Sequence, residues 1–157
     1  MPRVLRVVAL LALAFAALAL AACGGDDRKE KNAYVEHVND AQNNFAANVL
    51  TVSQRITNKS SSKQDRKTLE QFQAAIDDVV KELRAIKVPG SVTSEHKQLI
   101  AVMSGFGDEI KRATLALRNP DSRTIAEAQR TIQTATQTVN ARIEAAIAAI
   151  NSKLNPK

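Results

Sequence analysis

The sequence is poor in cysteine, glycine, proline and aromatic residues, and each scarcity excludes a class of protein. Cys23 is the only cysteine in 157 residues, so the chain cannot form an internal disulfide. Five glycines, four prolines and no tryptophan leave long stretches without residues that break helices. Few aromatics, together with abundant Ala, Gln and Lys, favour an all-helical protein, and no stretch has the alternating pattern of a strand.

Motifs that carry chemistry are also missing. The sequence contains no Gly-rich phosphate loop, no His-Glu-x-x-His, no Glu-x-x-His pair of the di-iron bundle type and no Gly-x-Ser-x-Gly elbow. We therefore expect neither an enzyme nor a bound cofactor. The basic residues are scattered and have no aromatic neighbours, so nucleic acid is not an expected partner.

The N-terminus has the order of a secretory signal. Arg3 and Arg6 precede a stretch over 7–22 that holds no charged residue, and the stretch ends on small residues, as a peptidase site does. The run is shorter than the about 20 apolar residues that span a bilayer. Residues 1–22 are accordingly predicted to be a signal peptide that is cleaved, and an uncleaved membrane anchor is the alternative.

The segment Leu20-Ala21-Ala22-Cys23 resembles the bacterial lipobox. The resemblance implies cleavage between Ala22 and Cys23 and a diacylglyceryl group on the Cys23 thiol. It also gives the single exported cysteine a role. Because each buried methylene contributes about 0.8 kcal/mol, two acyl chains would hold the protein firmly at the bilayer. The expected location is the extracytoplasmic face of the cell membrane.

The remainder of the chain divides into a short tether and one domain. Residues 23–32 contain two glycines, mixed charges and no apolar residue after Cys23, which is typical of a flexible linker. Residues 33–157 are long enough to bury a core as a single domain. Cleavage would remove two of the 22 basic residues and none of the 16 acidic ones, so the mature net charge falls from +6 to +4.

Apolar residues spaced three and four apart predict four helices, over about 33–58, 64–87, 91–117 and 124–153. The second stripe is the most regular, running Leu69, Phe72, Ile76, Val79, Leu83, Ile86. Short polar turns separate the helices, so we predict an antiparallel up-down-up-down four-helix bundle. Gly105 and Gly107 lie inside the third helix, where they indicate either close approach by a neighbouring helix or a hinge.

The two histidines are the sharpest candidates for a ligand site. His37 and His96 each lie about one turn into a predicted helix, and in this topology both lie at the anchored end. With Glu95 nearby, a metal site of two histidines and one carboxylate is conceivable. The alternative places His96 in the core, bonded to a carbonyl or a carboxylate, and His37 on the surface. Several lysines also gather at this end, interspersed with acids, as on a solvated face of mixed charge.

The lipobox, the Gly24-Gly25-Asp26-Asp27 run and the segments Leu83–Pro89 and His96–Leu99 are together similar to a group of small helical lipoproteins of actinobacteria. The resemblance implies the location and a helical bundle. The sequence thus favours a non-enzymatic envelope lipoprotein that binds or spaces a protein partner. The alternative is a binder of a small molecule or a metal, using the anchored end or a pocket at Gly105-Phe106-Gly107.

Overall fold

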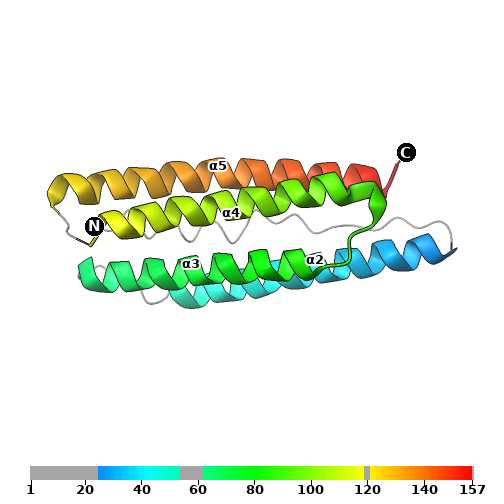
Figure 1. The fold of residues 1–157 in the computed structure, drawn as a ribbon, viewed down its shortest axis with the longest axis horizontal. Helices are drawn as coiled ribbons and strands as arrows, with labels where there is room; N and C mark the ends of the chain where they lie inside the picture. The colour runs from blue at the N-terminus through cyan, green and yellow to red at the C-terminus, as the bar shows by residue number, and fades with distance from the viewer. Residues whose placement is uncertain (1–24, 54–61, 119–120, 157) are drawn as a thin grey trace.

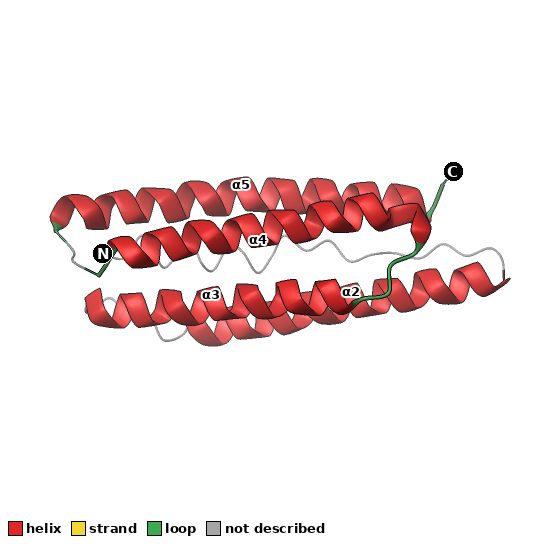
Figure 2. Ribbon diagram, viewed as in Figure 1, coloured by secondary structure: helices red, strands yellow, loops and turns green. Residues whose placement is uncertain are grey.

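A computed structural model describes residues 25–53, 62–118 and 121–156. These residues form the α-helices α2 (Gly25–Ser53), α3 (Ser62–Ala85), α4 (Thr93–Ala116) and α5 (Ser122–Leu154), with a 3-10 turn, η2 (Gly90–Val92), before α4. Helices account for nearly all of this part of the chain (Figure 2). The predicted signal peptide over 1–22 and the lipidation site at Cys23 lie outside the described residues.

The helices pack as an antiparallel four-helix bundle, which confirms the predicted fold class. The start of α2, the α3–α4 connection and the end of α5 lie together at one end of the bundle, on the right in Figure 1. The α4–α5 turn lies at the other end. We call the first of these the anchored end, after the lipid anchor predicted at Cys23, because α2 begins two residues after that position.

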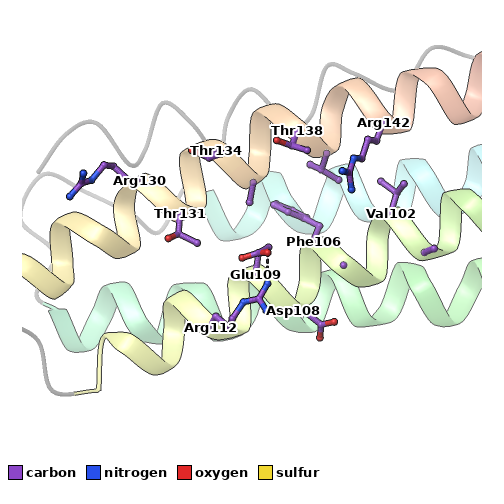
Figure 3. A pocket seen from close by; sticks show the side chains of 14 residues that line it. Val102, Phe106, Asp108, Glu109, Arg112, Arg130, Thr131, Thr134, Thr138 and Arg142 are labelled. Carbon is purple, nitrogen blue, oxygen red and sulfur yellow. Dashed lines mark hydrogen bonds and ion pairs between the residues drawn. The ribbon is translucent and has the colours of Figure 1, made fainter.

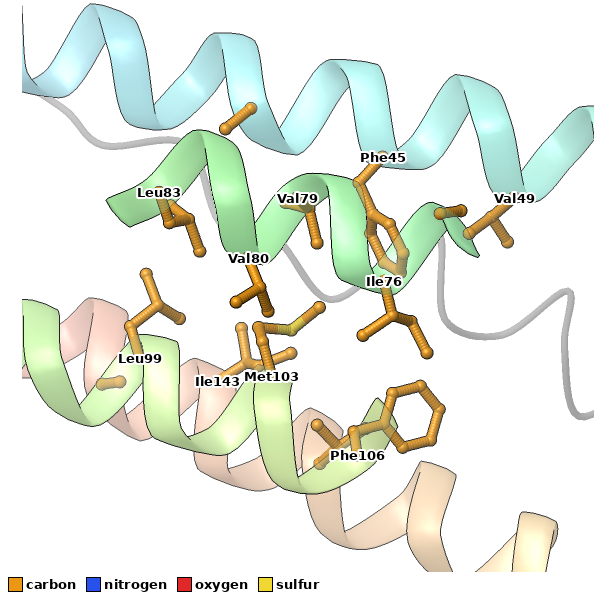
Figure 4. Packing of buried hydrophobic residues seen from close by; sticks show 14 of the residues in the cluster. Phe45, Val49, Ile76, Val79, Val80, Leu83, Leu99, Met103, Phe106 and Ile143 are labelled. Atoms are coloured by element: carbon orange, nitrogen blue, oxygen red, sulfur yellow. The ribbon is translucent and has the colours of Figure 1, made fainter. Parts of the chain in front are cut away.

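The predicted stripes form the core. Of the second stripe, Leu69, Phe72, Ile76, Val79 and Leu83 are buried, and the third and fourth stripes likewise turn inward. Phe72 lies between Phe45 and Phe106, with ring centroids 6.4 Å and 5.8 Å apart. Apolar side chains from all four helices meet around these rings (Figure 4). Burial of this shared face, rather than helix propensity, is what holds the bundle together.

The first helix begins earlier than predicted. It begins at Gly25 and not near residue 33, so the stretch 25–32, predicted to be a flexible tether, is helical. Asp27 favours this start, because an acidic residue complements the positive end of the helix dipole. These turns also contact the rest of the bundle: Glu30 pairs with Lys87 at 3.5 Å, and Lys31 Nζ donates to the Leu154 carbonyl at 3.5 Å.

The two glycines of the third helix have different surroundings. Helix α4 runs through both without a break. A Cβ on Gly107 would lie 3.2 Å from Ile76 Cγ2, whereas a Cβ on Gly105 would meet nothing within 4 Å. Close approach by a neighbouring helix is therefore confirmed at Gly107, where α3 packs against α4, and is wrong for Gly105.

Candidate functional site

A buried polar contact joins three helices near the anchored end. The Tyr34 hydroxyl of α2 lies 3.1 Å from His96 Nδ1 of α4, and His96 Nε2 lies 2.9 Å from the Leu83 carbonyl of α3. Because a carbonyl only accepts, Nε2 carries the ring proton, and neutral Nδ1 accepts from the tyrosine. Both ring nitrogens are thereby used within the bundle.

Burial sets the protonation of this pair. It lowers the pKa of His96, and the bond to the Leu83 carbonyl opposes that shift. Burial, with a smaller contribution from the Glu95 carboxylate, raises the pKa of Tyr34. At neutral pH both side chains are therefore uncharged, and His96 cross-links the helices as a neutral imidazole.

The structure separates the predicted ligand candidates. His96 is buried, whereas His37 is exposed on α2 and lines a shallow groove of about 380 Å³ against α3, together with Asp40, Glu82 and Lys87. Glu95 instead faces Lys153, with 4.0 Å between Oε1 and Nζ. Over residues 25–53, 62–118 and 121–156, no group of three His, Cys, Asp or Glu side chains is arranged to hold a metal ion.

The lysines of the anchored end are interleaved with acceptors. Lys87 pairs with Glu30, Lys153 with Glu95, and Lys31 with the Leu154 carbonyl. Exposed pairs of this kind contribute about 0–1 kcal/mol each. The surface at this end therefore carries mixed charge, and part of its positive charge is already paired with a carboxylate or a carbonyl.

A groove lies between α4 and α5, at the middle of the bundle. It encloses about 620 Å³. Val102, Phe106 and Val139 supply apolar surface, and Figure 3 shows the α5 threonines and the α4 side chains on its two sides. Gly105 keeps the groove open, since a side chain there would project into free space.

Three arginines lie along this groove: Arg112, Arg130 and Arg142. Arg112 forms an ion pair with Glu109. Arg130 and Arg142 are twelve residues apart on α5, a rise of about 18 Å. The groove thus combines an apolar floor with guanidinium groups towards its two ends.

Sequence reasoning reached part of this arrangement. The pocket predicted at Gly105-Phe106-Gly107 coincides with the groove at Gly105 and Phe106, whereas Gly107 packs against Ile76 of α3. The arginines and threonines of α5 were not predicted, because pairing of α5 residues with α4 depends on how the helices are rotated. Sequence reasoning also left open which groups bond His96.

No described helix is long and apolar enough to cross a bilayer. Comparison with known proteins finds no matching family model, no matching curated protein and no matching solved structure.

Proposed function

We propose that this chain is a lipoprotein, anchored through acylated Cys23 on the extracytoplasmic face of the cell membrane, that binds or spaces a protein partner without catalysing a reaction. The observation that carries the proposal is the start of α2 at Gly25, two residues after the lipobox cysteine. Two Cα steps span at most about 7 Å. A lipid on Cys23 would therefore hold the anchored end close to the headgroups.

The shape of the bundle is suited to contact with a neighbouring protein rather than to catalysis. Helix α2 has 29 residues, or about 43 Å at 1.5 Å per residue, so the α4–α5 turn would stand far from the lipid anchor. The buried histidine is used to cross-link helices, through Tyr34 and the Leu83 carbonyl. These features support a rigid module that presents its long faces to a neighbour in the envelope.

Fractionation of cells tests the anchor. The wild-type chain should stay with membranes after a carbonate wash and should be degraded by protease added to intact cells or spheroplasts. Cys23→Ala should leave the membrane fraction. If wild type and Cys23→Ala partition alike, the lipid anchor is refuted. If protease reaches the chain only after lysis, the extracytoplasmic location is refuted.

The α4–α5 groove favours a second candidate, a binder of small molecules. Its volume of about 620 Å³ falls within the about 300–1,000 Å³ of ligand sites. The apolar floor and the arginines fit an amphiphile with an anionic group. Native mass spectrometry of protein from native membranes should show such a molecule on wild type and not on Gly105→Phe, which would fill the groove. Equal occupancy in both would refute this candidate.

A further inference from the structure

The two ends of the α4–α5 groove differ in charge. Helix α4 runs away from the anchored end and α5 returns to it, so Val102 and Arg142 line the end of the groove nearer to the anchored end. Glu109, Arg112 and Arg130 line the other end. We call these the Arg142 end and the Arg130 end. Among the described lining residues, the Arg142 end holds a cation and no carboxylate.

The charges at the Arg130 end largely cancel. Glu109 forms an ion pair with Arg112. Asp108 adds a second carboxylate, which Figure 3 shows directed away from α5. The side chain of Arg130 points away from the middle of the groove in the same view. An anion in the groove would therefore meet little net positive charge at this end.

The guanidinium of Arg142 is placed differently. The side chain is exposed, and Figure 3 shows it directed from α5 towards α4, beside Val102. In the described part of the chain, no carboxylate forms an ion pair with Arg142. A guanidinium presents its N–H donors in a planar fork that matches a carboxylate or a phosphate. Arg142 is thus the lining group best placed to bind an anion.

From Arg142 the groove continues as a narrow track. Arg130 and Arg142 are twelve residues apart, a length of about 18 Å, so the volume of about 620 Å³ corresponds to a mean cross-section of about 34 Å². An α-helix about 10–12 Å in diameter has a cross-section of about 80–110 Å² and is too wide to lie inside. Val102 and Ala135 are partly buried apolar side chains, and Gly105 leaves open space beside them. These dimensions fit one extended hydrocarbon chain.

We propose that the α4–α5 groove binds a single-chain amphiphile whose head group is a carboxylate or a phosphate, and that Arg142 determines this specificity. The head group pairs with the Arg142 guanidinium, and the hydrocarbon chain extends past Gly105 towards the Arg130 end. Burial of the chain supplies affinity, and the charge pair supplies direction and specificity. A cationic amphiphile of equal length would place like charge beside Arg142 and is rejected. This inference rests on the second candidate function, the binder of small molecules, and assigns the class of ligand and its direction.

Photoaffinity labelling tests the assignment. Membranes that contain the full-length chain are irradiated with dodecanoate carrying a diazirine in its hydrocarbon chain, and mass spectrometry maps the labelled peptides. Arg142→Gln removes the proposed partner of the head group, and Arg130→Gln is the matched control at the other end of the groove. Gly105→Phe fills the groove. Circular dichroism during heating checks that each variant is folded.

Two further reagents test the head group. A dodecyltrimethylammonium probe with the same diazirine has the same chain and the opposite charge. Unlabelled dodecanoate and dodecyl phosphate compete with the probe, and the one that suppresses labelling at the lower concentration identifies the preferred head group. Suppression by either anion supports the inference.

The label should map to residues 101–112 of α4 or 130–142 of α5. Arg142→Gln should lower the labelling yield by about tenfold, Arg130→Gln should lower it by less than about twofold, and the ammonium probe should label only at background. Equal yields from Arg142→Gln and wild type, or equal labelling by the two probes, would overturn the role of Arg142. If Gly105→Phe abolished the label in that case, the groove would still be a binding site. No label on wild type, or equal labelling of wild type and Gly105→Phe, would overturn both the inference and the second candidate function.

Discussion

Replacing each glycine of α4 with alanine separates packing from helix propensity within one turn of helix. Alanine is favoured over glycine by about 1 kcal/mol at an interior helical position. At Gly105 nothing lies within 4 Å of the added Cβ, so the full gain should appear. Gly105→Ala should raise the free energy of unfolding by about 1 kcal/mol, and the midpoint of thermal unfolding by about 3 °C for a domain of this size.

Gly107→Ala gains the same propensity but meets α3. The new Cβ would lie 3.2 Å from Ile76 Cγ2, and Ile76 is fully buried, so it has little room to move. Overpacking of this kind costs about 1–3 kcal/mol. The net effect should lie between neutral and a loss of about 2 kcal/mol, which places the two variants about 1–3 kcal/mol apart.

Urea denaturation followed by circular dichroism at 222 nm measures both variants against wild type. The reasoning requires Gly105→Ala to be the more stable of the two. Equal stabilisation by both substitutions would show that α3 does not approach Gly107 closely. Destabilisation by Gly105→Ala would show that the α4–α5 groove is not open at this position.

Three further predictions concern the core and the buried histidine. Phe72→Ala should lower stability by about 3–5 kcal/mol in denaturant titration, because Phe72 packs against two other rings. Tyr34→Phe should cost about 1–2 kcal/mol in the same assay, since it leaves His96 Nδ1 buried without a donor. Burial lowers the pKa of His96 in the folded state, so below about pH 6.5 the unfolded chain binds the extra proton first. The stability that neutral His96 contributes is therefore present above that pH and is lost as the pH falls. His96→Gln should lose less free energy of unfolding between pH 7 and pH 5 than wild type, and equal losses would contradict this role.

Much of the bundle could be predicted because its apolar stripes are regular. The spacing of Leu69, Phe72 and Ile76 defines one face of a helix whatever its neighbours are, and these residues are buried as predicted. Ala residues and short polar turns then leave few alternatives to an antiparallel bundle.

The remaining features depend on tertiary contacts that periodicity does not specify. The glycine and charged residues at 25–32 have a linker composition, yet α2 begins there and its first turns contact Lys87 and the end of α5. Gln42 and Thr136 are polar, so a hydropathy pattern places them on the surface, whereas the packing of the bundle buries both. The Tyr34–His96 bond joins residues 62 positions apart, and no local pattern indicates it.

The most direct measurement of the central claim is the intact mass of the protein isolated from native membranes, for wild type and for Cys23→Ala. The lipoprotein proposal predicts a mature species that begins at Cys23 and carries the mass of a diacylglyceryl group, and predicts that this species is absent from the variant. An unlipidated full-length chain in the wild-type membranes would contradict the anchor, and with it the assignment of the bundle end that faces the bilayer.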